Sequence, residues 1–195
     1  MPYIPSLPPT ATLLDVFEEF PDTAVPLLDY HEVLMRGPSP LRADQRELIA
    51  AYVSGLNACA YCHGVHTATA ERFGVPAGTL TALLADLDTG PVDEPMRVLL
   101  GYVRKLTLDP GRVAPADAER VLDAGWDERA LYDAVSVCAL FNFMNRLVDG
   151  LGITAGPDYF DVAGRRLAAG GYAPLKDLLR EGGERPASPP SEPSR

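Results

Sequence analysis

The sequence predicts an all-α fold, and three observations support this prediction. Apolar residues recur at steps of three, four and seven along several segments, which is the spacing of one helix face. These segments open with residues that start helices, such as Ser39 and Pro40, and close at glycines such as Gly74 and Gly125. We find no alternating strand pattern followed by a hairpin turn, and no internal repeat of about 20 to 50 residues.

Each predicted helix has a start and a stop signal. In 39–56, Ser39 and Pro40 open the helix and apolar residues form one stripe. The next helix starts at Asn57, a good capping residue, and ends at Gly74. The longest apolar run, 128–152, predicts a central helix. The predicted helices cover residues 39–56, 57–74, 76–87, 93–108, 115–124, 128–152, 157–169 and 173–181.

The chain of 195 residues is predicted to form one domain with two appendages. Residues 1–23 form a proline-rich arm with a short helix, and residues 24–181 form the helical domain. The segment 182–195 is rich in Pro and Ser and almost free of apolar residues, which predicts a disordered tail.

The net charge and the N-terminal residues restrict which partners the protein can bind and in which cellular compartment we expect it. A formal net charge of -10 argues against nucleic acid and anionic membranes, because both require clustered Lys and Arg. The first residues do not resemble a secretion signal, and no window has the ~18 apolar residues of a membrane-spanning helix. We therefore expect a cytoplasmic protein that binds no nucleic acid or membrane. Thiols stay reduced there, so a C-x-x-C pair indicates catalysis or metal binding.

The stretch NACAYCHGVHTATAERFG, residues 57–74, holds two of the three cysteines and two of the three histidines. Cys59, Cys62 and His63 match the C-x-x-C-H signature of haem attachment, but covalent haem attachment generally takes place outside the cytosol. Cys59, Cys62 and His66 offer three zinc ligands, with Glu47 as a possible fourth. The remaining alternatives are a redox dithiol and simple packing of both cysteines in a helical bundle.

The redox interpretation follows from the spacing on a helix. Cys59 and Cys62 are three residues apart, and Cys62 and His66 are four apart, so all three share one face whereas His63 does not. A thiolate forms more readily at a helix N-terminus or beside an imidazole, and a carboxylate such as Glu47 orients that imidazole. The helix dipole favours Cys59 as the more acidic thiol, whereas His66 favours Cys62. We expect Cys62, because pairing with an imidazole has the larger effect.

The spacing E-x11-C-x2-C-x3-H over Glu47, Cys59, Cys62 and His66 resembles the signature of alkylhydroperoxidase D (AhpD) and its relatives in the carboxymuconolactone decarboxylase superfamily. The flanking text ELIAAYVSGLNACAYCHGVHTATAERFG is similar to that family, and NFMNRLVDGLG and PDYFDVAGRRLAAGGYAPL look like its peroxidase-related branch. The resemblance covers roughly residues 24–176.

We expect the helices 39–56 and 57–74 to form a hairpin in which Glu47 faces Cys59, Cys62 and His66. The resemblance implies an AhpD-like helical bundle built around this hairpin, and a thiol-dependent peroxidase that needs no cofactor. By the family pattern, Cys62 is oxidised to sulfenic acid, and Cys59 donates a proton and then closes a disulfide. Glu47 and His66 form the proton relay, in which His66 is the base that takes the proton from Cys62. The implied partners are a hydroperoxide, a lipoyl-bearing or thioredoxin-like dithiol reductant, and further copies of the chain as a dimer, trimer or hexamer. Two rival functions are a non-enzymatic zinc-binding or redox-sensing module and a decarboxylase-like enzyme of the same superfamily.

The chain departs from the family pattern at Tyr61, where the best-studied AhpD proteins have a histidine that belongs to their relay. This difference leaves the four main residues in place. Three polar residues, Asn142, Asn145 and Arg146, interrupt an apolar helix and must find partners if they are buried. We expect a structural place for His31.

Overall fold

The structure is a computed structural model that describes residues 1–182. These residues form ten α-helices and one short 3-10 helix, and they contain no strand, so the all-α prediction is confirmed. The tail that the sequence predicts lies outside the described residues, apart from Gly182 at the end of the last helix. None of the described helices has both the length and the apolar character needed to cross a membrane.

Most helix boundaries fall within about three residues of the predicted ones. Two helices precede residue 39, and the first of them lies in the predicted N-terminal arm. In chain order the elements are α1 (Leu13–Glu19), α2 (Pro21–Arg36), α3 (Ala43–Leu56), α4 (Ala60–Arg72), α5 (Thr79–Ala85), α6 (Glu94–Leu108), η1 (Pro110–Arg112), α7 (Pro115–Asp123), α8 (Glu128–Gly150), α9 (Pro157–Gly170) and α10 (Ala173–Gly182).

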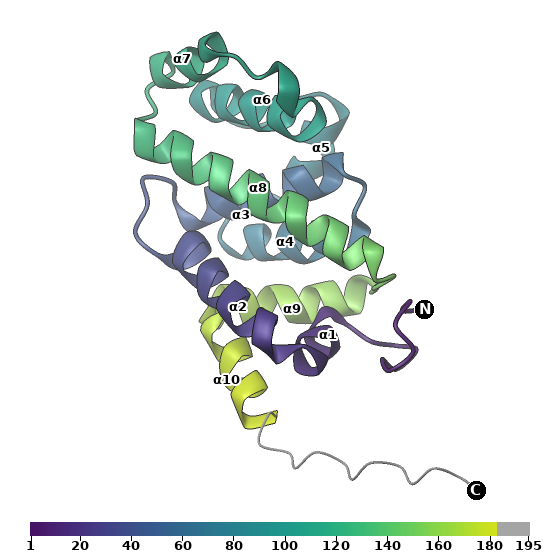
Figure 1. Ribbon diagram of the computed structural model, residues 1–195. Coiled ribbons are helices and arrows are strands. Elements are labelled where there is room, and N and C mark those ends of the chain that lie inside the picture. The colour runs from purple at the N-terminus through teal and green to yellow at the C-terminus, as the bar shows by residue number, and fades with distance from the viewer. Residues whose placement is uncertain (183–195) are drawn as a thin grey trace, which may run out of the picture.

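Helix α3 is the centre of the bundle. It packs against α4, α8, α6 and α5, and α4 packs in turn against α9 (Figure 1). Helices α6 and α7 close one end of the molecule, whereas α1, α9 and α10 lie towards the other end. All residues of α3 from Gln45 to Ser54 are buried, so the predicted single stripe is only part of its contact surface. The small residues Ala50, Ala51 and Ser54 allow neighbouring helices to approach the other faces of α3.

The turn between α3 and α4 corrects the predicted start of the second helix. Asn57 ends α3, whereas Cys59 precedes the first residue of α4. Between them, Ala58 adopts a left-handed conformation with a φ of 56°. Its amide donates to the Gly55 carbonyl, and the Cys59 amide donates to the Ser54 carbonyl, each at 3.0 Å. This pair of bonds forms a Schellman motif, which stops α3 before the chain can continue as one helix.

The left-handed alanine gives a first testable prediction. The left-handed conformation costs a non-glycine residue roughly 1–2 kcal/mol, and glycine avoids this cost. Part of the stabilisation is lost again, because glycine also gives the unfolded chain more conformational entropy. Ala58→Gly should therefore raise the free energy of unfolding by about 0.5–1 kcal/mol. Urea denaturation with an unchanged slope measures the effect.

The matched control is Ala82→Gly on the exposed face of α5. Ala82 lies inside a helix, where glycine should lower the free energy of unfolding by about 0.5–1 kcal/mol. If both variants lost the same stability, residue 58 would not hold a positive φ.

Candidate active site

A buried carboxylate joins α3 to α4 and α2. Glu47 of α3 is fully buried, and its Oε2 atom accepts a hydrogen bond from Nδ1 of His66 in α4 at 2.6 Å. Its Oε1 atom lies 2.7 Å from Nη2 of Arg36 at the end of α2. Burial alone would raise the pKa of Glu47, but His66 and Arg36 together lower it, so this side chain carries a negative charge.

The bond to Glu47 fixes the orientation of His66. A carboxylate can only accept, so Nδ1 of His66 carries the proton in this contact. Nε2 is then the nitrogen that can exchange a proton with another group. The His66 ring also meets the ring of Phe141 from α8 edge to face, with ring centroids 4.4 Å apart. Hydrogen bonding and packing therefore hold the imidazole in one orientation.

Arg36 was not predicted as a site residue. Besides its ion pair with Glu47, it donates to the Leu167 carbonyl at 3.1 Å and lies over the rings of Phe73 and Tyr172, at 5.1 and 5.3 Å. The sequence gives no spacing signal for it, because α2 reaches the site only through tertiary packing.

Cys59 and Cys62 lie at the N-terminal end of α4 as free, buried thiols. The two side chains are hydrogen-bonded to each other. This bond lowers the pKa of Cys59, whereas the same bond and burial raise the pKa of Cys62 well above its usual range. These directions run against the expectation that Cys62 is the more acidic thiol of the reduced pair. Within the pair, the surroundings therefore favour ionisation of Cys59 over ionisation of Cys62.

Helix α8 supports both thiols from the other side. Asn145 is hydrogen-bonded to Cys62, which offsets part of the rise in the Cys62 pKa. One turn later, Asp149 is hydrogen-bonded to Cys59 and opposes the fall in the Cys59 pKa. Both contacts come from an element that the motif does not include.

The polar residues of α8 form one network with the turn before the thiols. The Asn57 amide donates to Asn145 Oδ1 at 2.9 Å and to Asn142 Oδ1 at 3.1 Å. Asn145 in turn donates to the Ser54 hydroxyl at 3.0 Å, and Arg146 donates to Asn142 Oδ1 at 3.0 Å. These bonds fix the turn that positions Cys59, which gives the three interrupting residues a structural role.

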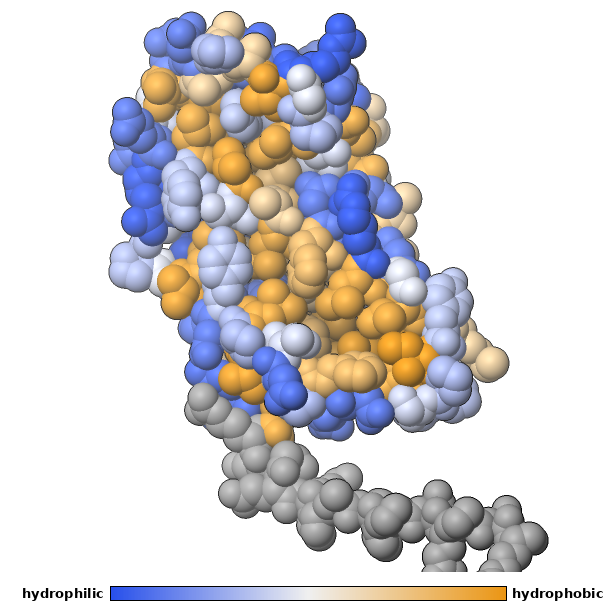
Figure 2. All heavy atoms as spheres, in the orientation of Figure 1, coloured by the Kyte–Doolittle hydropathy of each residue, from blue (hydrophilic) through white to orange (hydrophobic). Residues whose placement is uncertain are grey.

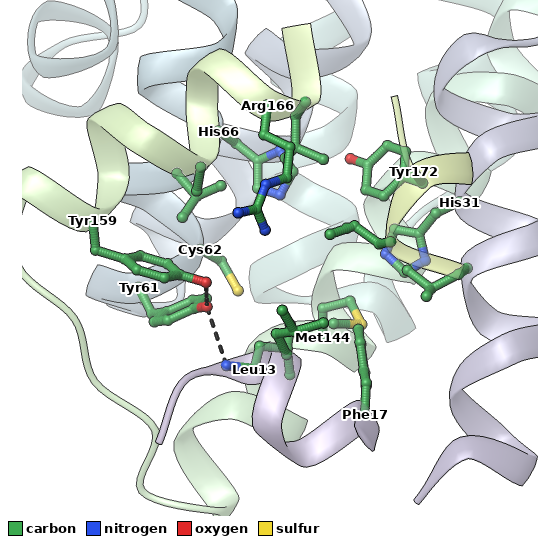
Figure 3. A pocket seen from close by; sticks show the side chains of 16 residues that line it. Leu13, Phe17, His31, Tyr61, Cys62, His66, Met144, Tyr159, Arg166 and Tyr172 are labelled. Atoms are coloured by element: carbon green, nitrogen blue, oxygen red, sulfur yellow. Dashed lines mark hydrogen bonds between the residues drawn. The ribbon is translucent and has the colours of Figure 1, made fainter. Parts of the chain in front are cut away.

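A mostly apolar cavity of about 90 Å³ gives access to one thiol (Figure 3). Cys62 and His66 lie in its wall, and Cys59 does not line it. Arg166 and Tyr172 are among its polar residues. Its walls come from six helices, and its lining residues are Leu13, Leu14, Phe17, Leu28, His31, Tyr61, Cys62, Val65, His66, Met144, Tyr159, Ala163, Arg166, Leu167, Tyr172 and Leu175.

Tyr61, which replaces the family histidine, ties three helices together at this cavity. Its hydroxyl accepts a hydrogen bond from the Leu13 amide at 3.2 Å and lies 2.6 Å from the hydroxyl of Tyr159 (Figure 3). Burial and the neighbouring Tyr159 raise the pKa of Tyr61, so it stays a neutral phenol. Tyr61 therefore fastens α1 and α9 over the cavity and cannot act as a base at neutral pH.

The two other histidines differ in their positions. His31 is buried and lines the cavity, and its Nδ1 donates to the Leu27 carbonyl at 2.8 Å. Burial lowers the pKa of His31 to about 4, so the ring is neutral at pH 7. His63 points away from the cavity, with Nδ1 2.9 Å from the Ala51 carbonyl.

Within residues 1–182, no group of three or more His, Cys, Asp or Glu side chains is arranged to hold a metal ion. Glu47 contacts Nδ1 of His66 directly, and the thiols bond to each other. The four side chains considered for zinc thus form two separate pairs.

The comparison with known proteins agrees with this architecture. The sequence profile of the Carboxymuconolactone decarboxylase family matches residues 21–90, which contain all four residues of the motif. An uncharacterized protein, YdfG of Bacillus subtilis (strain 168), is 26% identical over 114 residues, or 58% of this chain and 78% of that protein.

Two solved structures share the fold over most of the chain. An uncharacterized peroxidase-related protein from Silicibacter sp. TM1040 is 26% identical with a TM-score of 0.71, over 76% of this chain and 78% of the other. A second peroxidase-related protein, described as an alkylhydroperoxidase AhpD core, comes from Ralstonia eutropha JMP134. It is 23% identical with a TM-score of 0.70, over 77% of this chain and 78% of the other.

Proposed function

We propose that this chain is a thiol-dependent peroxidase of the AhpD-like group of the carboxymuconolactone decarboxylase superfamily and that it reduces organic hydroperoxides. One observation carries the proposal. Cys62 and His66 share the wall of one apolar cavity, with Cys59 hydrogen-bonded directly behind Cys62. A hydroperoxide in this cavity meets a thiol and a proton carrier, and the second thiol lies behind the first.

The first step starts from the singly deprotonated cysteine pair. Cys62 must be a thiolate to attack, and the Cys59 sulfur beside it accepts its proton. When the proton moves to Cys59, the Cys62 thiolate attacks the terminal peroxide oxygen. The O–O bond breaks, Cys62 becomes a sulfenic acid, and the alkoxide takes a proton from Nε2 of His66 to leave as an alcohol. Solvent then returns a proton to His66.

The second step uses the proton that Cys59 received. The Cys59 sulfur attacks the sulfenic sulfur of Cys62, and the hydroxyl group leaves with the Cys59 proton as water. The product is a disulfide between Cys59 and Cys62. An external dithiol must then reduce it, and we propose a lipoyl-bearing or thioredoxin-like protein, as the family resemblance implies. The protein residues supply every step of the peroxide half-reaction, so the proposal invokes no cofactor.

Glu47 and Arg36 have distinct roles in this scheme. The Glu47 carboxylate accepts from Nδ1 of His66 and so leaves Nε2 as the nitrogen that exchanges a proton at the cavity. Arg36 keeps Glu47 ionised despite its burial. The proton that His66 donates therefore depends on an ion pair with α2.

The test is consumption of tert-butyl hydroperoxide in the presence of dihydrolipoamide as reductant. The wild-type protein and Cys138→Ser should both turn over, because Cys138 lies apart from the cavity beside Thr107. A decarboxylase-like enzyme of the superfamily does not need the C-x-x-C pair, so ring-opening activity that survives loss of both cysteines would favour that rival. Metal analysis of protein purified under reducing conditions separates a zinc module from a peroxidase.

An apolar surface on α8 and α2 supports the proposed oligomer. Tyr132 and Phe143 lie on one side of α8 and are 63% and 51% exposed, and Val33 of α2 is 70% exposed. Figure 2 shows a broad apolar area in the middle of this face of the molecule. Exposed apolar area of this kind commonly forms an interface between subunits.

We expect the chain to assemble into a dimer, trimer or hexamer. Light scattering at micromolar concentration should give a multiple of 21.0 kDa. Phe143→Glu should shift the mass towards the single chain, whereas Leu108→Glu on the exposed end of α6 should not. A wild-type mass of one chain would overturn this expectation.

A further inference from the structure

The hydroxyl group of Tyr172 is buried at the cavity and has no hydrogen-bond partner within the described part of the chain. Figure 3 shows its ring among the residues that surround the cavity, with the hydroxyl directed towards the side occupied by His66 and Arg166. Buried tyrosine hydroxyls usually find a partner, because water no longer supplies one. An unpaired donor in the wall of a cavity that also holds Cys62 indicates that a ligand supplies the missing acceptor.

The surrounding residues fix the position of Tyr172. Gly171 before it has a φ of 65°, and a side chain there would come within 2.6 Å of the Glu32 carboxylate. The same carboxylate accepts from the amides of Tyr172 at 2.6 Å and Ala173 at 3.2 Å. The ring of Tyr172 also packs 5.0 Å from the ring of His31. The hydroxyl group is thus held in place without a bond of its own.

The electrostatic surroundings make this hydroxyl a donor. Burial, and then the charge of Glu47, raise the pKa of Tyr172 well above its usual range, so the phenol keeps its proton. The neighbouring His31 cannot supply a proton to a ligand. It is neutral at pH 7, and its Nδ1 proton is bound to the Leu27 carbonyl. A ligand that contacts this side of the cavity therefore meets one fixed donor.

We propose that the Tyr172 hydroxyl donates a hydrogen bond to the leaving oxygen of the hydroperoxide, which assigns this residue a catalytic contact within the proposed peroxidase function. As the Cys62 thiolate attacks the terminal oxygen, the O–O bond breaks and its electron pair moves to the oxygen that bears the organic group. Tyr172 stabilises the alkoxide that forms there and keeps its own proton. The proton that completes the alcohol comes from His66.

This role predicts which peroxides benefit from Tyr172. An alkoxide is a strong base and gains most from a donor in the transition state, as in an oxyanion hole. A carboxylate that leaves from a peracid already spreads its charge and gains little. The site is therefore suited to alkyl hydroperoxides, whose alcohols are poor leaving groups.

The test compares two oxidants in wild-type protein and in Tyr172→Phe. Single-turnover rates of Cys62 oxidation are measured with tert-butyl hydroperoxide and with peracetic acid. We expect Tyr172→Phe to slow the reaction with tert-butyl hydroperoxide at least tenfold more than the reaction with peracetic acid. The control is Tyr159→Phe, which removes a cavity hydroxyl that already bonds to Tyr61, and which should change both rates by the same factor.

Equal slowing of both oxidants by Tyr172→Phe would overturn the proposal and leave the peroxidase function intact. If wild-type Cys62 reacts with neither oxidant, the peroxidase function fails and this contact fails with it. Thermal unfolding gives an independent check, since Tyr172→Phe removes an unpaired buried hydroxyl and should not lower the midpoint. A lower midpoint would reveal a structural partner for the hydroxyl and would also overturn the proposal.

Discussion

Replacing Cys62 by serine should abolish peroxide consumption. A serine hydroxyl is not appreciably ionised at neutral pH and cannot be oxidised to a sulfenic acid, so no other group in the cavity can perform the first step. Turnover with tert-butyl hydroperoxide and dihydrolipoamide should fall to the rate without protein. Cys138→Ser is the matched control, because it also removes one buried thiol.

The companion variant, Cys59→Ser, separates the roles of the two thiols. Cys62 should still be oxidised once, because it keeps its place with His66 in the cavity wall and loses the Cys59 contacts that raise its pKa. The sulfenic acid then has no resolving thiol and should accumulate. A dimedone-type reagent traps the sulfenic acid, and mass spectrometry identifies the modified cysteine. An adduct on Cys59 in the Cys62→Ser protein, with none on Cys62 in the Cys59→Ser protein, would reverse the assignment.

Glu47→Gln should have the second-largest effect on activity. The neutral amide loses the ion pair with Arg36 and the charged acceptor for Nδ1 of His66, so the imidazole that supplies the alcohol proton loses the partner that orients it. General acid catalysis contributes about 10²- to 10⁴-fold, so the rate of Cys62 oxidation should fall by at least about 100-fold. Stopped-flow measurement at one equivalent of peroxide gives this rate. A change of less than threefold would remove Glu47 from the mechanism.

The pH dependence of stability provides a second readout of Glu47. Its pKa in the folded protein is lowered, so the unfolded chain binds more protons and stability rises with pH in the acid range. The contribution is complete above the unfolded pKa of roughly 4.3 and is lost as pH falls through the folded pKa. Glu47→Gln should therefore flatten the acid branch of the unfolding free energy. It should also lower stability at neutral pH, because Arg36 loses its buried partner.

The sequence predicted most helices because their apolar periodicity and their start and stop residues agree with one another. It failed at Asn57, where a good capping residue ends α3 instead of starting α4. The reason is tertiary, since the Asn57 amide bonds to Asn142 and Asn145 of α8. A capping preference of about 1 kcal/mol is smaller than such a network can supply.

The candidate site was predictable only within the motif. Glu47 and His66 lie on adjacent helices, and their contact follows from the hairpin that the spacing predicts. Arg36 comes from a segment that carries no recognisable pattern, and the resemblance around Tyr172 assigns that residue no role, so only packing reveals them. The order of the two thiol pKa values also depends on the folded structure, because it follows from the hydrogen bond between Cys59 and Cys62.

Anaerobic thiol counting before and after one equivalent of tert-butyl hydroperoxide tests the central claim most directly. The denatured protein should show three free thiols before the reaction, and one afterwards, with Cys138 as the thiol that remains. The loss of two thiols should disappear in Cys62→Ser. An unchanged count of three, or the same loss in Cys62→Ser, would contradict a peroxidase that works through Cys62 and Cys59.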